Sequence, residues 1–590
     1  MARPGRLAAV LAHPRLPWLA ALLGVLLASP ALAQGLQLDD LLHRAWVELA
    51  LQGEAPGPWW DFYAVARDPE SNRMAMEVGA SPWWALPELR IRFWRPLSAA
   101  THVVDYGLWP DAAWLMHAES LAWYGGLVLA VGALLRRLLG PTWVAGLGTV
   151  LYAIDDAHAV PASWIAQRNA LIVAVLVVTM LWAHDRARRD GWRPGRWLGP
   201  LLLGAALLAG ESAVAGLGYL VAHALLLEPH EQGATRGARL LRAARGLVPY
   251  GVVLVGWRLL YTGLGYGAHG SGVYLDPARE PGAYVAVLPD RIAALALGEL
   301  AWPTPESWAA DPMPWTLVRW GAVAAVGLLG LGLAPRLGRE RGLAVLVVGA
   351  GLALLPAATA VPSARLLLLV GVGASAAVAS VIAVALGEGG VARWRWPAVV
   401  LAIPLLLIHG ALAPVMLVHR IVERGRSLER ASATTVEGFP ADEALAQQTL
   451  VIVNAPPTFI AATLWLTPGR EAALPRSLRL LGSTFAPVVV QRPDPRSLVL
   501  QPVGGYLGDP FTTLLRGPAH PFAAGDTVAL AGWSVRVLGV AHGRPSSVRF
   551  DFDEPLDDPS LRWIVWRDGR FVPFEPPAPG RAAAIPGVVP

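Results

Sequence analysis

The chain has 590 residues, of which 55% are hydrophobic and only 15% are charged, a balance typical of a polytopic membrane protein rather than a soluble enzyme. It has no cysteine, which excludes disulfide bonds and thiolate metal sites. It has no lysine, so all of its positive charge at pH 7 is arginine, and the net charge is +5. Arginines beside membrane spans explain this charge without a nucleic acid partner.

Apolar runs predict the membrane part of the chain, because a spanning helix needs about 20 mostly apolar residues. About eleven spans are expected over residues 15–34, 112–135, 142–156, 169–184, 197–211, 213–227, 244–263, 315–334, 342–361, 365–387 and 395–418. The predicted fold class is therefore a polytopic α-helical membrane domain over residues 1–424.

Arginine-rich segments predict the orientation of these spans. The residues before the first span and the segments "LLRRLLG", "HDRARRDGWRPGR", "RGARLLRAAR", "PRLGRER" and "ARWRW" all fall on one side, which the positive-inside rule makes cytoplasmic. Residues 35–111, 264–314 and the part after about 419 then face outward. The use of arginine in place of lysine is typical of G+C-rich bacterial genomes. Together with the orientation of the spans, it predicts a multi-pass protein of the bacterial inner membrane with a periplasmic C-terminal domain.

The first span also ends in "LASPALAQG", a pattern like a signal-peptidase site after Ala33. We favour an uncleaved span, and either outcome leaves the next loop outside.

The character of the sequence changes from about residue 425. Short runs rich in Val, Ile, Trp and Phe, such as "TLVIVNAPP" and "GDTVALAGWSVRVLGVA", alternate with Gly, Pro and Asp turns. We expect a β-rich extracytoplasmic domain over residues 425–590, without a catalytic motif and with a loose tail, "PPAPGRAAAIPGVVP".

Ionisable residues gather at the predicted outer ends of the spans, where they are costly and often functional. In "GLQLDDLLHRAW", helix capping explains one of Asp39 and Asp40 but does not require both. Arg95 in "RIRFWRPLS" suits bidentate phosphate binding, although an interfacial anchor is the simpler interpretation of that residue alone.

The stretch "LYAIDDAHAVPASWIAQRNALI" adds Asp155, Asp156, His158 and Arg168 on the same side, and "LLAGESAVAG" adds Glu211. The two aspartates could end a helix or hold a divalent cation. Together these carboxylates, histidines and arginines could bind an anionic lipid head group beside a general base.

Four features in order resemble the GT-C superfamily of membrane glycosyltransferases, particularly the protein O-mannosyltransferase and TPR-containing O-mannosyltransferase branch. They are Asp39-Asp40 after the first span, "RPL" at Arg95, His117 in "AWLMHAESLAWY", and the block containing His158 and Arg168. Glu211 is similar to the glutamate of a later lysine-glutamate pair in that family. The resemblance covers about residues 15–230.

The sequence departs from this family at several points. Asp155-Asp156 stand where histidine-proline is usual, Val160 replaces an acidic residue, and a β-rich domain takes the place of TPR repeats. These departures leave the acceptor, and also the donor, open.

The resemblance implies inverting transfer of a hexose from a polyprenyl-phosphate-linked sugar to a protein or glycan acceptor at the outer membrane face. Asp40 or Asp39 would be the general base, and Arg95, Arg168 and His158 would bind the donor phosphate. His117, Asp155, Asp156 and Glu211 would support the site. No cofactor is required beyond an optional divalent cation.

Other functions fit the same sequence. A transporter should carry broken or charged helices near the bilayer midplane, whereas the ionisable residues here lie at span ends. A non-catalytic scaffold that presents its outer domain, and a lipid-diphosphate-using oligosaccharide polymerase or ligase, remain alternatives.

Overall fold

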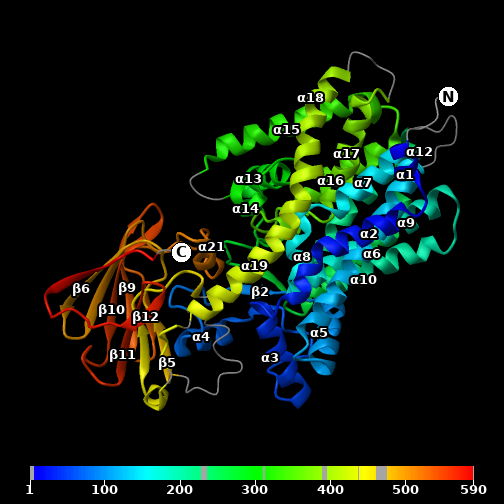
Figure 1. Cartoon of the computed structure of the whole chain (residues 1–590). Coiled ribbons are helices and arrows are strands. Elements are labelled where there is room, and N and C mark those ends of the chain that lie inside the picture. Colours follow the sequence, from blue (N-terminus) through cyan, green and yellow to red (C-terminus); the bar gives the residue numbers. More distant parts are fainter. Residues whose placement is uncertain are drawn as a thin grey trace.

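The computed structural model describes residues 6–227, 236–309, 313–388, 395–435, 437–440, 442–459 and 475–588. A bundle of helices forms one side of the molecule and a β-rich domain the other, and the long helix α19 (Ala413–Thr435) runs from the bundle to the β-rich domain (Figure 1).

Apolar helices make up the bundle. They are α1 (Arg6–Ala12), α2 (Leu16–Ala28), α6 (Ala113–Leu139), α7 (Trp143–Ala153), α9 (Arg168–Arg189), α10 (Gly195–Ala209), α11 (Gly216–Leu226), α12 (Arg236–Gly263), α15 (Trp315–Leu337), α16 (Arg341–Ala357), α17 (Val370–Ala385) and α18 (Arg395–Leu405), which continues into α19. Within the described residues, six helical segments are long and apolar enough to cross a membrane, as the sequence predicts for a membrane protein. Five further apolar helices have only 10–17 residues, so the count of eleven spans stays a prediction.

Small residues let these helices approach closely, as is common in membrane bundles. A Cβ atom at Gly146 would lie 1.9 Å from the carbonyl oxygen of Leu11, and one at Gly342 would lie 2.0 Å from that of Leu138. Helix α17, built mainly from Gly, Ala, Ser and Val, is buried along its whole length and forms the centre of the bundle.

The predicted outer loops contain regular structure at one end of the bundle. The first holds α3 (Asp39–Gln52), α4 (Pro69–Val78) and α5 (Pro96–Leu108), and the second holds α13 (Pro281–Leu300) and α14 (Pro305–Trp308). A small antiparallel sheet joins the two loops, in the order β1 (Ala64–Ala66), β2 (Arg90–Arg92), β3 (Gly267–His269). This sheet fixes residues 264–280 against the first loop.

The β-rich C-terminal region that the sequence predicts is confirmed. One six-stranded sheet has the order β13-β6-β7-β10-β9-β8 and a four-stranded sheet has the order β12-β11-β4-β5. The strands are β4 (Thr449–Ile452), β5 (Ser477–Leu480), β6 (Val488–Asp494), β7 (Ser497–Pro502), β8 (Thr527–Leu530), β9 (Trp533–Ala541), β10 (Arg544–Phe552), β11 (Leu561–Arg567), β12 (Arg570–Pro573) and β13 (Arg581–Ile585), with helix α21 (Pro510–Leu514) between β7 and β8.

The expectation of a loose tail was wrong. Residues Arg581–Ile585 form β13, which pairs antiparallel with β6 from Arg581 opposite Arg492 to Ile585 opposite Val488. The alanine-rich sequence of this strand does not indicate a β-strand. The strand forms because β6 supplies its hydrogen bonds.

The C-terminal domain shares its hydrophobic core with the first outer loop. Trp83 and Trp84 are each 1% exposed and belong to the same buried cluster as Phe550 and Val535 of the sheets. The indole N–H of Trp83 donates to the carbonyl oxygen of Leu481 over 3.2 Å. The proposed division at residue 424 stays a prediction, but the buried core of the C-terminal domain includes residues from the first loop.

Candidate functional site

A cavity of about 1230 Å³ lies where one end of the helix bundle meets the two predicted outer loops and the C-terminal domain. Its lining comes from α3, the β1-β2-β3 sheet, the start of α9 with the residues just before it, residues 211–215 before α11, α12, the 264–280 segment, α16, the residues before α17, and α21. A cavity of this size is large enough for a ligand such as a sugar with part of a lipid.

Asp39 is half-buried and lines this cavity as the first residue of α3. In the described part of the chain its carboxylate has no hydrogen-bond partner. Burial raises the pKa of Asp39 above its ordinary value, and three guanidinium groups oppose this effect, those of Arg365, Arg424 and Arg95. The cavity therefore contains a free carboxylate in a cationic environment.

Asp40 has a different role, because its side chain is fully buried and does not line the cavity. One carboxylate oxygen accepts the backbone N–H of Gln37 at 2.8 Å, and the other accepts that of Ala166 at 2.7 Å. Burial nevertheless raises the pKa of Asp40 to about 7. The hydrogen bond from Ala166 attaches the start of α3 to the segment before α9, and the one from Gln37 fixes the turn that leads into α3. Together they position Asp39.

The backbone is strained beside this carboxylate. Leu38, which caps α3 and lines the cavity, has a φ of 49°, a conformation that costs a non-glycine residue about 1–3 kcal/mol. The hydrogen bond from Gln37 to Asp40 spans Leu38 and holds this conformation in place.

Arg95 also lines the cavity, at the N-terminal cap of α5. Its Nε donates to a carboxylate oxygen of Glu211 over 2.8 Å, and its guanidinium lies 4.6 Å from the ring centre of Phe93. The sequence prediction placed both charged residues at the outer side, and the structure brings them together. The remaining N–H groups of Arg95 can contact a ligand anion.

Two further arginines that the sequence analysis missed lie in the cavity wall. Arg258 of α12 pairs with Asp276 at 2.7 Å, whereas Arg365, in the described part of the chain, donates to the hydroxyl of Tyr274 over 3.2 Å. No carboxylate in the described residues forms an ion pair with Arg365. A single arginine in "VPSARLLLL", between two apolar runs on the outer side, was the signal that could have identified Arg365.

Arg168 lies outside the cavity lining and is fully buried. Its guanidinium contacts Asp105 at 2.6 Å and Glu119 at 2.7 Å, and it donates to the carbonyl oxygen of Met116 over 2.7 Å. These contacts join α5, α6 and α9. Arg168 therefore has the surroundings of a residue that fixes helices.

The two predicted histidines are also buried away from the cavity lining. His158 is 1% exposed, and its Nδ1 lies 3.3 Å from the hydroxyl of Tyr124. Burial lowers its pKa to about 3, so the ring is neutral near pH 7. His117 is fully buried within α6.

Asp155 and Asp156 line a separate small pocket together with Glu299 and His409. Asp156 pairs with Arg420 of α19 at 2.6 Å, and Asp155 accepts the backbone N–H of Ala157 at 2.9 Å. The predicted divalent cation at this pair stays a prediction.

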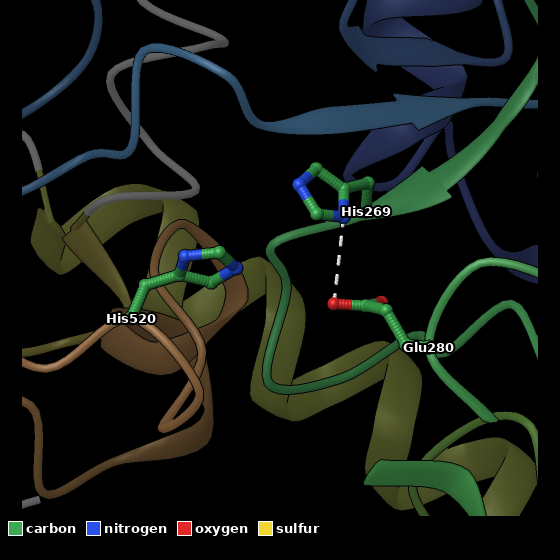
Figure 2. A group of neighbouring side chains, drawn as sticks. All are labelled: His269, Glu280 and His520. Carbon is green, nitrogen blue, oxygen red and sulfur yellow. Dashed lines mark ion pairs between the residues drawn. The ribbon is translucent and has the colours of Figure 1, made fainter. Parts of the chain in front are cut away.

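Among the described residues, three potential metal ligands lie close enough to share an ion at another place, which does not include Asp155 or Asp156. They are His269, Glu280 and His520 (Figure 2).

The inner part of the cavity is apolar and reaches the outside of the bundle. Val255 of α12 and Leu355 of α16 line it, and they are 57% and 41% exposed. In a membrane such exposed apolar residues would face lipid. The cavity thus connects the charged residues around Asp39 to a lipid-facing surface.

Comparison with known proteins gave only remote structural likenesses. No family model matches the chain, and no curated protein matches it. It is similar to an oligosaccharyltransferase from Archaeoglobus fulgidus, tethered with an acceptor peptide, at 12% identity and a TM-score of 0.41, covering 80% of this chain and 64% of that one. It is also similar to ArnT from Cupriavidus metallidurans, bound to undecaprenyl phosphate, at 14% identity and a TM-score of 0.37, covering 77% and 86% of the two chains.

The chain thus spans less than two thirds of the length of the oligosaccharyltransferase. Likenesses this remote do not define a family, so the functional proposal rests on the residues of the cavity.

Proposed function

We propose that the chain is a membrane glycosyltransferase of GT-C type that transfers a sugar from a polyprenyl-phosphate donor to an acceptor hydroxyl. The observation that carries the proposal is the free carboxylate of Asp39 among arginines, in a cavity that continues to lipid-facing apolar residues. A lipid phosphate is the ligand that matches both ends of this cavity, because its charge needs cations and its hydrocarbon needs an apolar surface.

The donor phosphate is assigned to Arg95 and Arg365. Both line the cavity, and the positive charge of each favours the ionised form of Asp39. Fixed guanidinium groups stabilise the negative charge that develops on a departing phosphate. We prefer these two residues to Arg168 and His158 because the latter lie outside the cavity lining and have partners of their own.

Asp39 is assigned as the general base, in preference to the hydrogen-bonded Asp40. The acceptor oxygen attacks the anomeric carbon on the face opposite the phosphate, and its proton moves to the Asp39 carboxylate. The new carbon–oxygen bond forms as the bond to the phosphate oxygen breaks, so the configuration inverts and polyprenyl phosphate leaves. The raised pKa of Asp39 makes it a stronger base than an exposed aspartate.

The remaining roles follow from the contacts. Glu211 orients Arg95, and Asp40 orients Asp39. Phe511 and Leu514 of the C-terminal domain border the cavity, so this domain is assigned to acceptor binding, with a protein or a glycan as acceptor. A hexose donor, an O-mannosyltransferase-like activity and a periplasmic site in a bacterial inner membrane belong to the same proposal.

The test uses purified protein in lipid vesicles supplied with a panel of polyprenyl-phosphate and polyprenyl-diphosphate sugars. Release of polyprenyl phosphate from one monophosphate donor, by transfer or slow hydrolysis, is expected. Consumption of a diphosphate donor instead would favour the polymerase or ligase alternative. If no donor is consumed, and native mass spectrometry finds no polyprenyl phosphate bound by wild type, the proposal is wrong.

A further inference from the structure

Three side chains of types that can bind a metal ion lie close together where the 264–280 segment meets the C-terminal domain. His269 comes from β3, Glu280 from the residue before α13, and His520 from the loop after α21 (Figure 2). One donor atom from each lies within 4.8 Å of the others. The three residues are distant in sequence, so the fold alone brings them together.

The spacing of one pair of these donors fits a single metal ion. Nδ1 of His269 lies 3.4 Å from a carboxylate oxygen of Glu280. Two ligands of one tetrahedral zinc, each about 2.0–2.1 Å from the metal, are about 3.3 Å apart. The rings of His269 and His520 have centres 5.3 Å apart in an edge-on arrangement.

Two polar atoms of this group are buried without partners. Oε2 of Glu280 and Nε2 of His520 make no hydrogen bond within the described structure. Buried polar atoms are almost always satisfied, by protein, water or an ion. A bound cation would satisfy these atoms at once.

The surrounding backbone holds the three residues in place. His269 is paired in the sheet opposite Arg90. The N–H of Gly517 donates to the carbonyl oxygen of Gly270 over 2.7 Å, and the guanidinium of Arg516 donates to that of His520 over 3.2 Å. A site on such fixed segments loses little entropy when it binds a metal.

We propose that His269, Glu280 and His520 bind one zinc ion, which fastens the 264–280 segment to the C-terminal domain. Two histidines and one carboxylate are a common zinc ligand set, completed by water. The fastened segment carries Tyr274 and Asp276, which line the large cavity, so the metal would stabilise one cavity wall. This inference is independent of the proposed glycosyltransferase activity.

The test is a zinc titration of the full-length, tag-free, metal-stripped protein in nanodiscs, with a chromophoric chelator as competitor. We expect one equivalent of Zn²⁺ to bind, and Co²⁺ at the same site to give the visible absorption of a tetrahedral complex. His269→Gln, Glu280→Gln and His520→Gln should each weaken Zn²⁺ binding by at least about 100-fold.

His542→Asn provides the control, because His542 is exposed in the turn between β9 and β10, and Asn tolerates its φ of 53°. This variant should bind Zn²⁺ like wild type. Hydrogen exchange provides a second measurement, since Zn²⁺ should slow exchange in residues 264–280 of wild type but not of His520→Gln. Substoichiometric binding by wild type, or equal affinity in all four variants, would overturn the proposal.

Discussion

Asp39 and Asp40 are adjacent in the sequence, but their surroundings give them different chemistry. Asp39 lines the cavity without a hydrogen-bond partner in the described structure, whereas both oxygens of Asp40 accept backbone N–H groups. The sequence could show only that capping does not need two carboxylates. Which of the two faces the cavity depends on the segment around Ala166, more than a hundred residues away.

Substitution to asparagine should separate the two aspartates. In Asp40→Asn, an amide NH₂ replaces one acceptor oxygen and faces a backbone N–H, so stability should fall by about 1–3 kcal/mol. Asp39→Asn should change stability by less than about 0.5 kcal/mol, because no hydrogen bond is lost. Thermal unfolding in detergent measures both, and equal destabilisation by the two substitutions would argue against this distinction.

Arg365 should influence both donor binding and the pH dependence of turnover. Removing this cation in Arg365→Gln makes ionised Asp39 less stable, which raises its pKa further. The base is active when deprotonated, so activity is lost as pH falls, and this acid limb of kcat/KM should move to higher pH. The donor KM should rise about 10-fold through loss of a charged hydrogen bond.

The control is Arg562→Gln, which removes an arginine from the surface of the C-terminal domain, where it pairs with Asp442. Its pH profile and donor KM should match wild type. An unchanged acid limb of kcat/KM in Arg365→Gln would contradict the assignment of Arg365 to the donor site.

At the scale of elements, the long apolar helices follow directly from hydropathy, and each predicted span overlaps a helix of the bundle. Elements that depend on distant partners were missed. Strand β13 exists because β6 offers it an edge, and the β1-β2-β3 sheet joins segments from two separate loops. Arg168 shows the same limit, because the sequence revealed its charge but not its partners Asp105 and Glu119.

Arg168 should stabilise the junction of α5, α6 and α9. Arg168→Met leaves fully buried Asp105 without its cation, and breaking a buried pair in this way costs about 3–5 kcal/mol. Thermal unfolding should show this loss, and the double variant Arg168→Met/Asp105→Leu should recover part of it. A normal unfolding temperature with a raised donor KM would instead support the phosphate-binding role expected from the sequence.

At the scale of the whole molecule, the first outer loop and the C-terminal domain form one folded unit beside the membrane bundle (Figure 1). The sequence predicted a β-rich domain but could not show that Trp83, about 400 residues earlier, completes its core. The ring of Trp83 lies 5.5 Å from that of Phe522 and 5.9 Å from that of Phe550. The cavity depends on this unit, which forms its outer wall.

Trp83→Ala should therefore destabilise the C-terminal domain by about 3–5 kcal/mol, the usual cost of removing a large buried aromatic. Hydrogen exchange in β9 and β10 should become faster. Trp59→Ala, at a position that is 40% exposed, should leave the exchange of these strands unchanged. Protection of β9 and β10 in Trp83→Ala equal to wild type would mean that the two segments fold separately.

The most direct test of the central claim is the turnover of the identified donor by Asp39→Asn, with donor binding measured in parallel. Asp553→Asn, which alters an exposed carboxylate of the C-terminal domain outside the cavity lining, is the matched control. We predict that Asp39→Asn binds the donor normally but releases polyprenyl phosphate about 10²–10⁴-fold more slowly than wild type, while Asp553→Asn is unaffected. Equal release by all three proteins would contradict the assignment of Asp39 as the base.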